Sequence, residues 1–182
     1  IINLPLVNRD VYSLLNLTPG VEATESGNAF GYPAQRAMIN GSSDGGAGSV
    51  NYYLDGGNNM AGLRNTGNPA PNPDAVREFR VITNSYGAEF GRFAGGVIDV
   101  VTKSGTNSLH GSLFEFLRNS ALDANNFFDP AGETPPFRMN QFGFVVGGPV
   151  VIPGIYNRDR SNTFFFFNYE GYRFRRGVNS II

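Results

Sequence analysis

Apolar and polar positions divide this chain into a first stretch of short elements and a second stretch of longer strands. Near the start, Val11, Leu14 and Leu15 recur at the spacing of an amphipathic helix. We expect this helix to begin after a cap at Asn8 and to end at Pro19-Gly20. A second helical turn is predicted at 74–77, after Pro73.

Short apolar runs predict four strands in this first stretch, at 36–40, 50–54, 79–83 and 97–102. The segments between them are predicted loops, because they have no clear period or are rich in Gly, Asn, Ser and Pro; they are 22–35, 41–48 and 56–73. Two helices and about four short strands make an α+β unit that ends near Lys103.

Three longer segments follow, at 109–118, 139–147 and 163–175, and each alternates in the manner of a strand. Phe114 and Phe116 oppose Glu115 in the first segment. In the other two, the apolar positions are Phe142, Phe144, Val146, Phe165, Phe167 and Tyr169, and the opposite positions include Gln141, Gly143, Gly147, Asn168 and Glu170. The pattern is typical of a transmembrane barrel, but also of half-buried strands in a soluble sandwich, and three strands cannot close a barrel.

Composition narrows the choice of class. The 182 residues include 14 basic and 15 acidic ones, so no basic surplus points to nucleic acid. Charged residues make up only 16%, aromatic residues 13%, and there are 16 Phe and 24 Gly, which favours a β-rich or membrane-barrel protein. Cysteine is absent, which excludes a disulfide scaffold and a thiolate site. The chain begins at Ile1 without a signal peptide, and we interpret it as a fragment or a processed chain.

Residues 88–107, AEFGRFAGGVIDVVTKSGTN, are the most informative stretch, because a small-residue bend leads into an apolar strand that stops at TKSG. This stretch resembles the closing segment of the plug domain in TonB-dependent outer-membrane receptors. Further segments resemble the Oar-like group of that family, and they occur in the family's order. The plug segments are NLPLVNRD and LTPGV in the first helix, followed by RAMING, YYLDG and DAVREF. The segments of the first three barrel strands are LHGS with FEFLRN, QFG with GGP, and FFFFNYEG. Asn40 stands where the family usually has Arg, and Thr83-Asn84-Ser85 stands where many receptors have Arg-Gly-Pro.

The resemblance implies an α+β plug domain with a short mixed sheet and small helices at 1–105, followed at 106–182 by the first three antiparallel strands of an incomplete transmembrane β-barrel. It implies a bacterial outer-membrane transporter whose plug gates the energy-coupled uptake of a nutrient. Its partners would be TonB, through a segment upstream of residue 1, a small-molecule, oligosaccharide or peptide nutrient, and outer-membrane lipid, but no nucleic acid. The alternative is a soluble β-rich ligand-binding or adhesion module without a transport role.

The resemblance also gives candidate site residues. Loops at the plug apex would contact substrate, and their candidates are Ser42, Ser43, Asp44, Asn58, Asn59 and Arg64. Ion pairs between plug and barrel would hold the gate shut, and their candidates are Arg36, Glu78, Arg92 and Glu115.

The residue types and their spacing argue against a catalytic or metal site. Gly41-Ser42-Ser43-Asp44-Gly45 has the form G-x-S-x-G, but a loop follows it where a nucleophile elbow needs a helix, and His110 is the one histidine available as a base. Asp55, Asn58 and Asn59 lack the spacing of a calcium loop, and a single histidine is a poor basis for a zinc site. We therefore expect no enzyme, no cofactor and no metal site.

Overall fold

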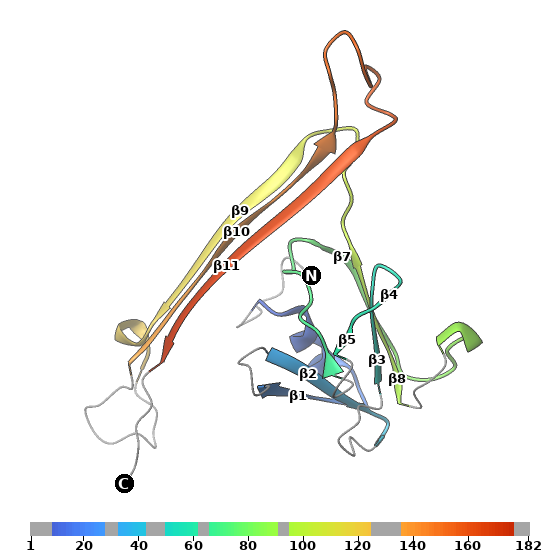
Figure 1. The fold of residues 1–182 in the computed structure, drawn as a ribbon. Coiled ribbons are helices and arrows are strands. Elements are labelled where there is room, and N and C mark those ends of the chain that lie inside the picture. Colours follow the sequence, from blue (N-terminus) through green and yellow to red (C-terminus); the bar gives the residue numbers. More distant parts are fainter. Residues whose placement is uncertain are drawn as a thin grey trace. The chain divides into compact units, whose positions relative to one another are not determined.

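The computed structural model describes residues 9–27, 33–42, 50–61, 66–90, 95–124 and 136–176. The chain divides into two units, Ile1–Lys103 and Ser104–Ile182. In their described parts, the first unit has two small sheets and short 3₁₀ helices, and the second has one long antiparallel sheet with a single 3₁₀ turn (Figure 1). None of the helices in the described ranges has the length and apolar character needed to cross a membrane.

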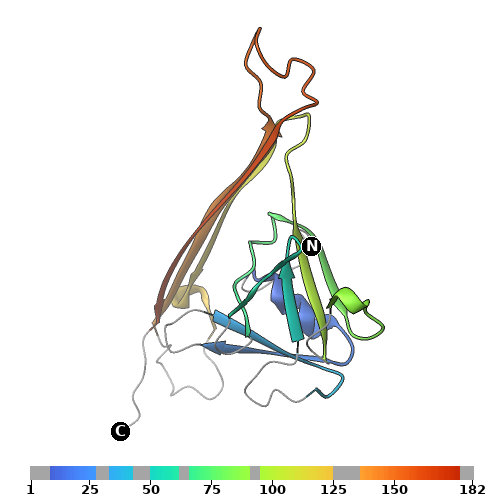
Figure 2. The same ribbon diagram turned by 45° about the vertical axis from the view of Figure 1, so that its right-hand side comes forward.

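The first sheet of unit 1 is built on an antiparallel hairpin. Strands β1 (Val21–Gly27) and β2 (Pro33–Ile39) pair with Val21 opposite Ile39. The two-residue strands β6 (Thr66–Gly67) and β5 (Met60–Ala61) extend the sheet in the order β1-β2-β6-β5. Helix η1 (Val11–Leu17) lies beside this hairpin (Figure 2).

The second sheet of unit 1 is mixed. Its strands are β4 (Gly57–Asn58), β3 (Val50–Leu54), β8 (Gly96–Thr102) and β7 (Val76–Ile82), in that order. Strands β3 and β8 are parallel, and the other pairs are antiparallel. The short helix η2 (Ala88–Phe90) places the Phe90 ring edge-on to Tyr53, with 5.5 Å between ring centroids.

Both sheets and η1 contribute to one core. Asp10 caps η1 by accepting a hydrogen bond from the Tyr12 amide (3.0 Å), and Val11, Tyr12 and Leu15 of this helix are at most 1% exposed. The Tyr12 ring meets Tyr52 edge-on at 5.5 Å, which anchors η1 to β3. The buried cluster consists of Val11, Tyr12, Leu15, Ala37, Ile39, Val50, Tyr52, Val76, Ile98 and Val100.

Unit 2 is a curved sheet of three strands with the order β11-β10-β9 (Figure 1). The strands are β9 (His110–Asn119), β10 (Phe137–Pro149) and β11 (Phe164–Arg176), and η3 (Ser120–Leu122) follows β9. Both pairings are antiparallel and continuous: Phe144 lies opposite Leu113 on one side and Tyr169 on the other. Asn157, which is buried, holds the connection from β10 to β11 through bonds from its amide to the Val150 and Thr163 carbonyls.

Most predicted strands of the chain are confirmed. Strand β3 has the predicted bounds, and the strands at 97–102 and in unit 2 lie within two residues of the prediction. The stripe of η1 is also confirmed, although the helix is 3₁₀ and its cap is Asp10, whereas the predicted cap Asn8 lies outside the described residues.

Three predictions of local structure are wrong. Residues 22–35 were expected to be a loop, yet β1 and the start of β2 lie there, because pairing with β2 stabilises a strand whose own side chains are small or polar. The helical turn at 74–77 is limited to a turn at Pro73–Ala75, because Lys103 donates to the Ala75 carbonyl (2.8 Å) and Val76 already begins β7. The long loop at 56–73 contains three two-residue strands, which pair with β2, β3 and each other.

Candidate functional site

The predicted substrate residues are only partly within the described structure. Ser43, Asp44 and Arg64 lie outside the described residues. Ser42 closes the turn after β2, where its hydroxyl accepts from the Ile39 amide (3.1 Å). Asn58 is exposed in β4, whereas the Asn59 amide group donates inward to the Asn68 carbonyl (3.2 Å) and the Tyr12 hydroxyl (3.4 Å). Asn59 therefore has a structural role in the position described.

Asp55, in the turn between β3 and β4, joins this turn to the end of β8. Its carboxylate accepts from both the amide and the hydroxyl of Thr102, each at 2.8 Å. Asp55 has φ +50°, a left-handed conformation that Asp tolerates better than most residues. Both carboxylate oxygens are therefore engaged, and within the described residues no group of three or more potential metal ligands is found.

Charged side chains of unit 1 gather on β7 and β8. Glu78 pairs with Arg80 of its own strand (2.6 Å), and this bond lowers the pKa of Glu78 and raises that of Arg80. Asp99 lies opposite Arg80, and partial burial raises the pKa of its carboxyl although Arg80 opposes the shift. Arg36 is half-buried on β2, and Arg92 lies outside the described residues.

The ion pair between Arg9 and Asp74 was not singled out from the sequence. Their side chains are 14% and 9% exposed, so the pair is nearly buried. It ties Arg9, which precedes the Asp10 cap of η1, to Asp74 in the turn before β7, 65 positions along the chain. No local signal could have paired them.

One face of the unit 2 sheet is apolar over most of its length. The register aligns Leu113, Phe144 and Tyr169 across the three strands, and Val146 and Phe167 in the next row. We call this side the apolar face; its members are Leu109, Leu113, Phe142, Phe144, Val146, Phe165, Phe167 and Tyr169. Leu113 is 85% exposed and Phe167 54%, so the face is uncovered within unit 2.

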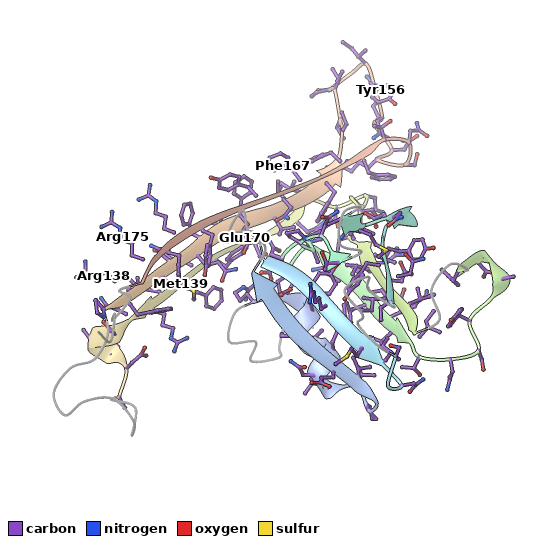
Figure 3. All side chains as sticks on the ribbon, turned by 60° about the horizontal axis from the view of Figure 1, so that its bottom comes forward. Arg138, Met139, Tyr156, Phe167, Glu170 and Arg175 are labelled. Atoms are coloured by element: carbon purple, nitrogen blue, oxygen red, sulfur yellow. The ribbon has the colours of Figure 1, made fainter. Side chains whose placement is uncertain are left out.

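The other side, which we call the mixed face, alternates polar and aromatic residues; its members are His110, Ser112, Phe114, Phe116, Met139, Gln141, Val145, Asn168, Glu170, Tyr172 and Phe174. Gln141 donates to Glu170 on this face. Met139 and Glu170 lie on one side of the sheet, and Phe167 and Arg175 lie on the other (Figure 3). A sheet with one continuous apolar face and one mixed face can separate lipid from an aqueous interior.

Glycines let aromatic rings lie flat on both faces. A Cβ at Gly143 would be 2.6 Å from the Phe114 ring, and a Cβ at Gly171 would be 2.6 Å from the Phe142 ring. The rings therefore cover the backbone where no side chain stands.

The register decides which faces of the three strands coincide, which alternation within each strand leaves open. Phe114 and Phe116 lie with Gln141 and Gly143 on the mixed face, and not with Phe142 and Phe144. Glu115 lies on the apolar face, where its carboxylate accepts from the Asn140 amide group (3.4 Å).

Arg138, Arg173 and Arg175 also lie on the apolar side of the sheet, at its far end, and were not singled out from the sequence. Two arginines spaced by two residues on a predicted strand were the available signal, because that spacing places both on one face.

The G-x-S-x-G hypothesis gains no support. Ser43 is outside the described residues, and the His110 Nδ1 donates locally to the Ser108 carbonyl (3.0 Å). The His110 ring also covers Gly147, since a Cβ there would be 2.9 Å from its Nε2. The His110 side chain thus contacts residues of unit 2, Ser108 and Gly147.

Comparisons with known proteins agree with this geometry. Residues 101–182 match the family model described as an outer membrane beta barrel domain. The chain is 30% identical over 158 residues to the TonB-dependent transporter Oar of Myxococcus xanthus, which covers 79% of this chain and 13% of that protein. Its structure resembles that of the siderophore receptor PirA from Acinetobacter baumannii, with a TM-score of 0.53 and 26% identity over 81% of this chain and 21% of the receptor.

The chain thus spans only a small part of both relatives. These relatives are a transporter and a receptor, not enzymes. The sequence and structural matches cover about four fifths of the chain and include residues from both of its units. The family resemblance expected from the sequence is confirmed, and with it the location: this chain is homologous to the TonB-dependent transporters of the bacterial outer membrane.

Proposed function

We propose that this chain is the gate and the first wall of an energy-coupled outer-membrane transporter. Residues 1–105 form the plug, and residues 106–182 form the first three strands of the barrel. The observation that carries the proposal is the two-faced sheet of unit 2, which directly follows a mixed-sheet unit ending at Lys103. An apolar face against lipid and a mixed face toward an aqueous lumen are what a barrel wall requires.

The plug would block the lumen until TonB, acting on a segment upstream of residue 1, rearranges it. The nutrient is a small molecule, an oligosaccharide or a peptide. Strand β9 would run from the periplasmic to the extracellular side, so the β9–β10 connection is extracellular and the β10–β11 turn is periplasmic. The chain does no covalent chemistry and needs no cofactor.

Deletion of residues 1–105 from the full-length protein tests the gate. The expected result is a cell that becomes sensitive to large antibiotics which the outer membrane normally excludes, because an unplugged barrel leaves an open pore. Arg158→Gln in the β10–β11 turn serves as a control that should leave the cell resistant. An unplugged protein that reaches the outer membrane and admits nothing would overturn the gating role.

Within the plug, we propose that the apex residues Ser43, Asp44, Asn58 and Arg64 contact the nutrient, with Ser42 shaping the turn beside them. Asn59 is assigned to the core, because its amide group holds Tyr12 and Asn68. Binding of the nutrient to the purified full-length protein should weaken in Asn58→Ala and in Arg64→Ala. If both variants bind like the unmodified protein, the apex does not contact the nutrient.

For the gate, we propose that Arg36 and Arg92 face carboxylates of the barrel. Glu78 is held by Arg80, and Glu115 lies on the apolar face, so neither is assigned to the gate. Arg36→Gln with Arg92→Gln should raise the leak of large antibiotics, and Arg80→Gln should not. Equal leak in the two variants would remove these arginines from the gate.

A soluble ligand-binding or adhesion module is the rival function. Cell fractionation separates the two: the transporter is extracted from the outer membrane only by detergent, whereas the module is released without it.

A further inference from the structure

Three arginines stand together at one end of the apolar face. Arg138 lies directly opposite Arg175, and Arg173 lies opposite Asn140 in the same pair of strands. All three side chains are exposed, and no ion pair joins any of them to a carboxylate within the described ranges. Like charges directly opposite each other destabilise a strand pair, so this arrangement favours a bound anion between them.

The spacing along the strand puts the arginines at the border of the apolar band. From Gly148, opposite Phe165, to Arg138 is 148 − 138 = 10 residues of β10. At about 3.4 Å per residue and a tilt of about 40°, this is about 26 Å along the membrane normal, against about 25 Å for the apolar band of a membrane barrel. The arginines therefore lie at the level of lipid headgroups, and the aromatic rows at the level of acyl chains.

The arginines surround a hollow that suits a phosphate group. Its volume is about 230 Å³, and its lining includes Leu117, Asn119, Arg138, Asn140, Arg173 and Arg175. Each guanidinium presents a planar fork of N–H donors that matches a phosphate, and Leu117 offers apolar contact on the side of the acyl chains.

We propose that Arg138, Arg173 and Arg175 bind the phosphate groups of an anionic glycolipid in the outer leaflet of the outer membrane. The leaflet rests on the proposed function, which puts the β9–β10 end of the sheet outside. A lipid fits better than free phosphate, because the rows that follow Asn140 and Arg173 on the same face belong to the exposed apolar face, beginning with Phe142 and Phe144, and would hold its acyl chains.

The test uses the full-length protein, purified in mild detergent from its native outer membrane. Native mass spectrometry then counts the phosphorylated glycolipid that stays bound. Arg173→Gln with Arg175→Gln is compared with Arg158→Gln and Arg160→Gln, a control pair in the β10–β11 turn that removes the same charge from the other end. A heat-shifted band on a gel confirms that each variant folds as a barrel.

The expected result is at least a tenfold loss of bound glycolipid in the Arg173 and Arg175 variant, with no loss in the control pair. Dephosphorylated glycolipid should fail to rebind to the unmodified protein, and inorganic phosphate should not displace the intact lipid. Equal retention by both variants, or loss only in the control pair, would overturn the inference. Displacement by inorganic phosphate would also overturn it, in favour of a free-anion site. If the unmodified full-length protein gives no heat-shifted band, the proposed function itself fails; an unmodified protein that forms a normal barrel but holds no glycolipid refutes only the lipid site.

Discussion

The Asp55 carboxylate links the β3–β4 turn to the end of β8. Replacing it by Ala removes two hydrogen bonds to Thr102, each at 2.8 Å, and leaves Ala at φ +50°. The two bonds are exposed and contribute about 1 kcal/mol together, and the left-handed conformation costs Ala about 1 kcal/mol more. The expected total is about 2 kcal/mol, or about a 30-fold change in the local opening equilibrium.

Hydrogen exchange measured by mass spectrometry on the full-length protein reads this change directly. Peptides that contain the Thr102 amide should exchange about 30-fold faster in Asp55→Ala. Asp55→Asn is the matched control, because its amide can accept from the Thr102 amide and donate to its hydroxyl, and because Asn tolerates the left-handed region. It should stay within about threefold of the unmodified protein.

Two outcomes would refute this reasoning. Unchanged exchange in Asp55→Ala would mean that the clamp contributes nothing to the end of β8. Equal acceleration in the Ala and Asn variants would mean that the charge of Asp55, and not its two hydrogen bonds, provides the stabilisation.

Three further predictions follow from the buried groups and the close contacts. Burial raises the pKa of Tyr12 from 10.0 to about 12, so the stability that the neutral phenol contributes is complete below pH 10 and is lost as the pH rises to 12, about 3 kcal/mol in all. The tyrosinate absorbance of the unmodified protein minus that of Tyr12→Phe should titrate near pH 12, and a midpoint near 10 would contradict the burial. Arg9→Met leaves Asp74 buried without its counter-ion and should cost about 3–5 kcal/mol, seen as faster proteolysis of residues 1–103, with most of the loss recovered when Asp74→Leu is added. Gly143→Val places a Cβ 2.2 Å from the Tyr169 carbonyl oxygen and should abolish the heat-shifted barrel band, whereas Ser112→Val should keep it.

Local pattern was sufficient for the long strands. β9, β10 and β11 were predicted to within two residues because each carries an alternating run of apolar side chains, which needs no partner to be recognised. Strand β1 was missed because Glu22 and its neighbours are no better suited to a strand than to a loop. Its pairing with β2, and its packing beside η1, supply the stabilisation that its own sequence lacks.

By itself, then, the sequence determined which residues share a face within each strand, and through family resemblance it determined the family and the membrane. Only the tertiary structure decided which faces coincide: that Phe114 lies with Gln141, that Glu115 lies with Phe142, and that Arg138 lies opposite Arg175. The physical reason is that alternation with period two is a property of one strand, whereas register is a property of two. A shift by one residue would exchange the two faces without changing the sequence pattern of either strand.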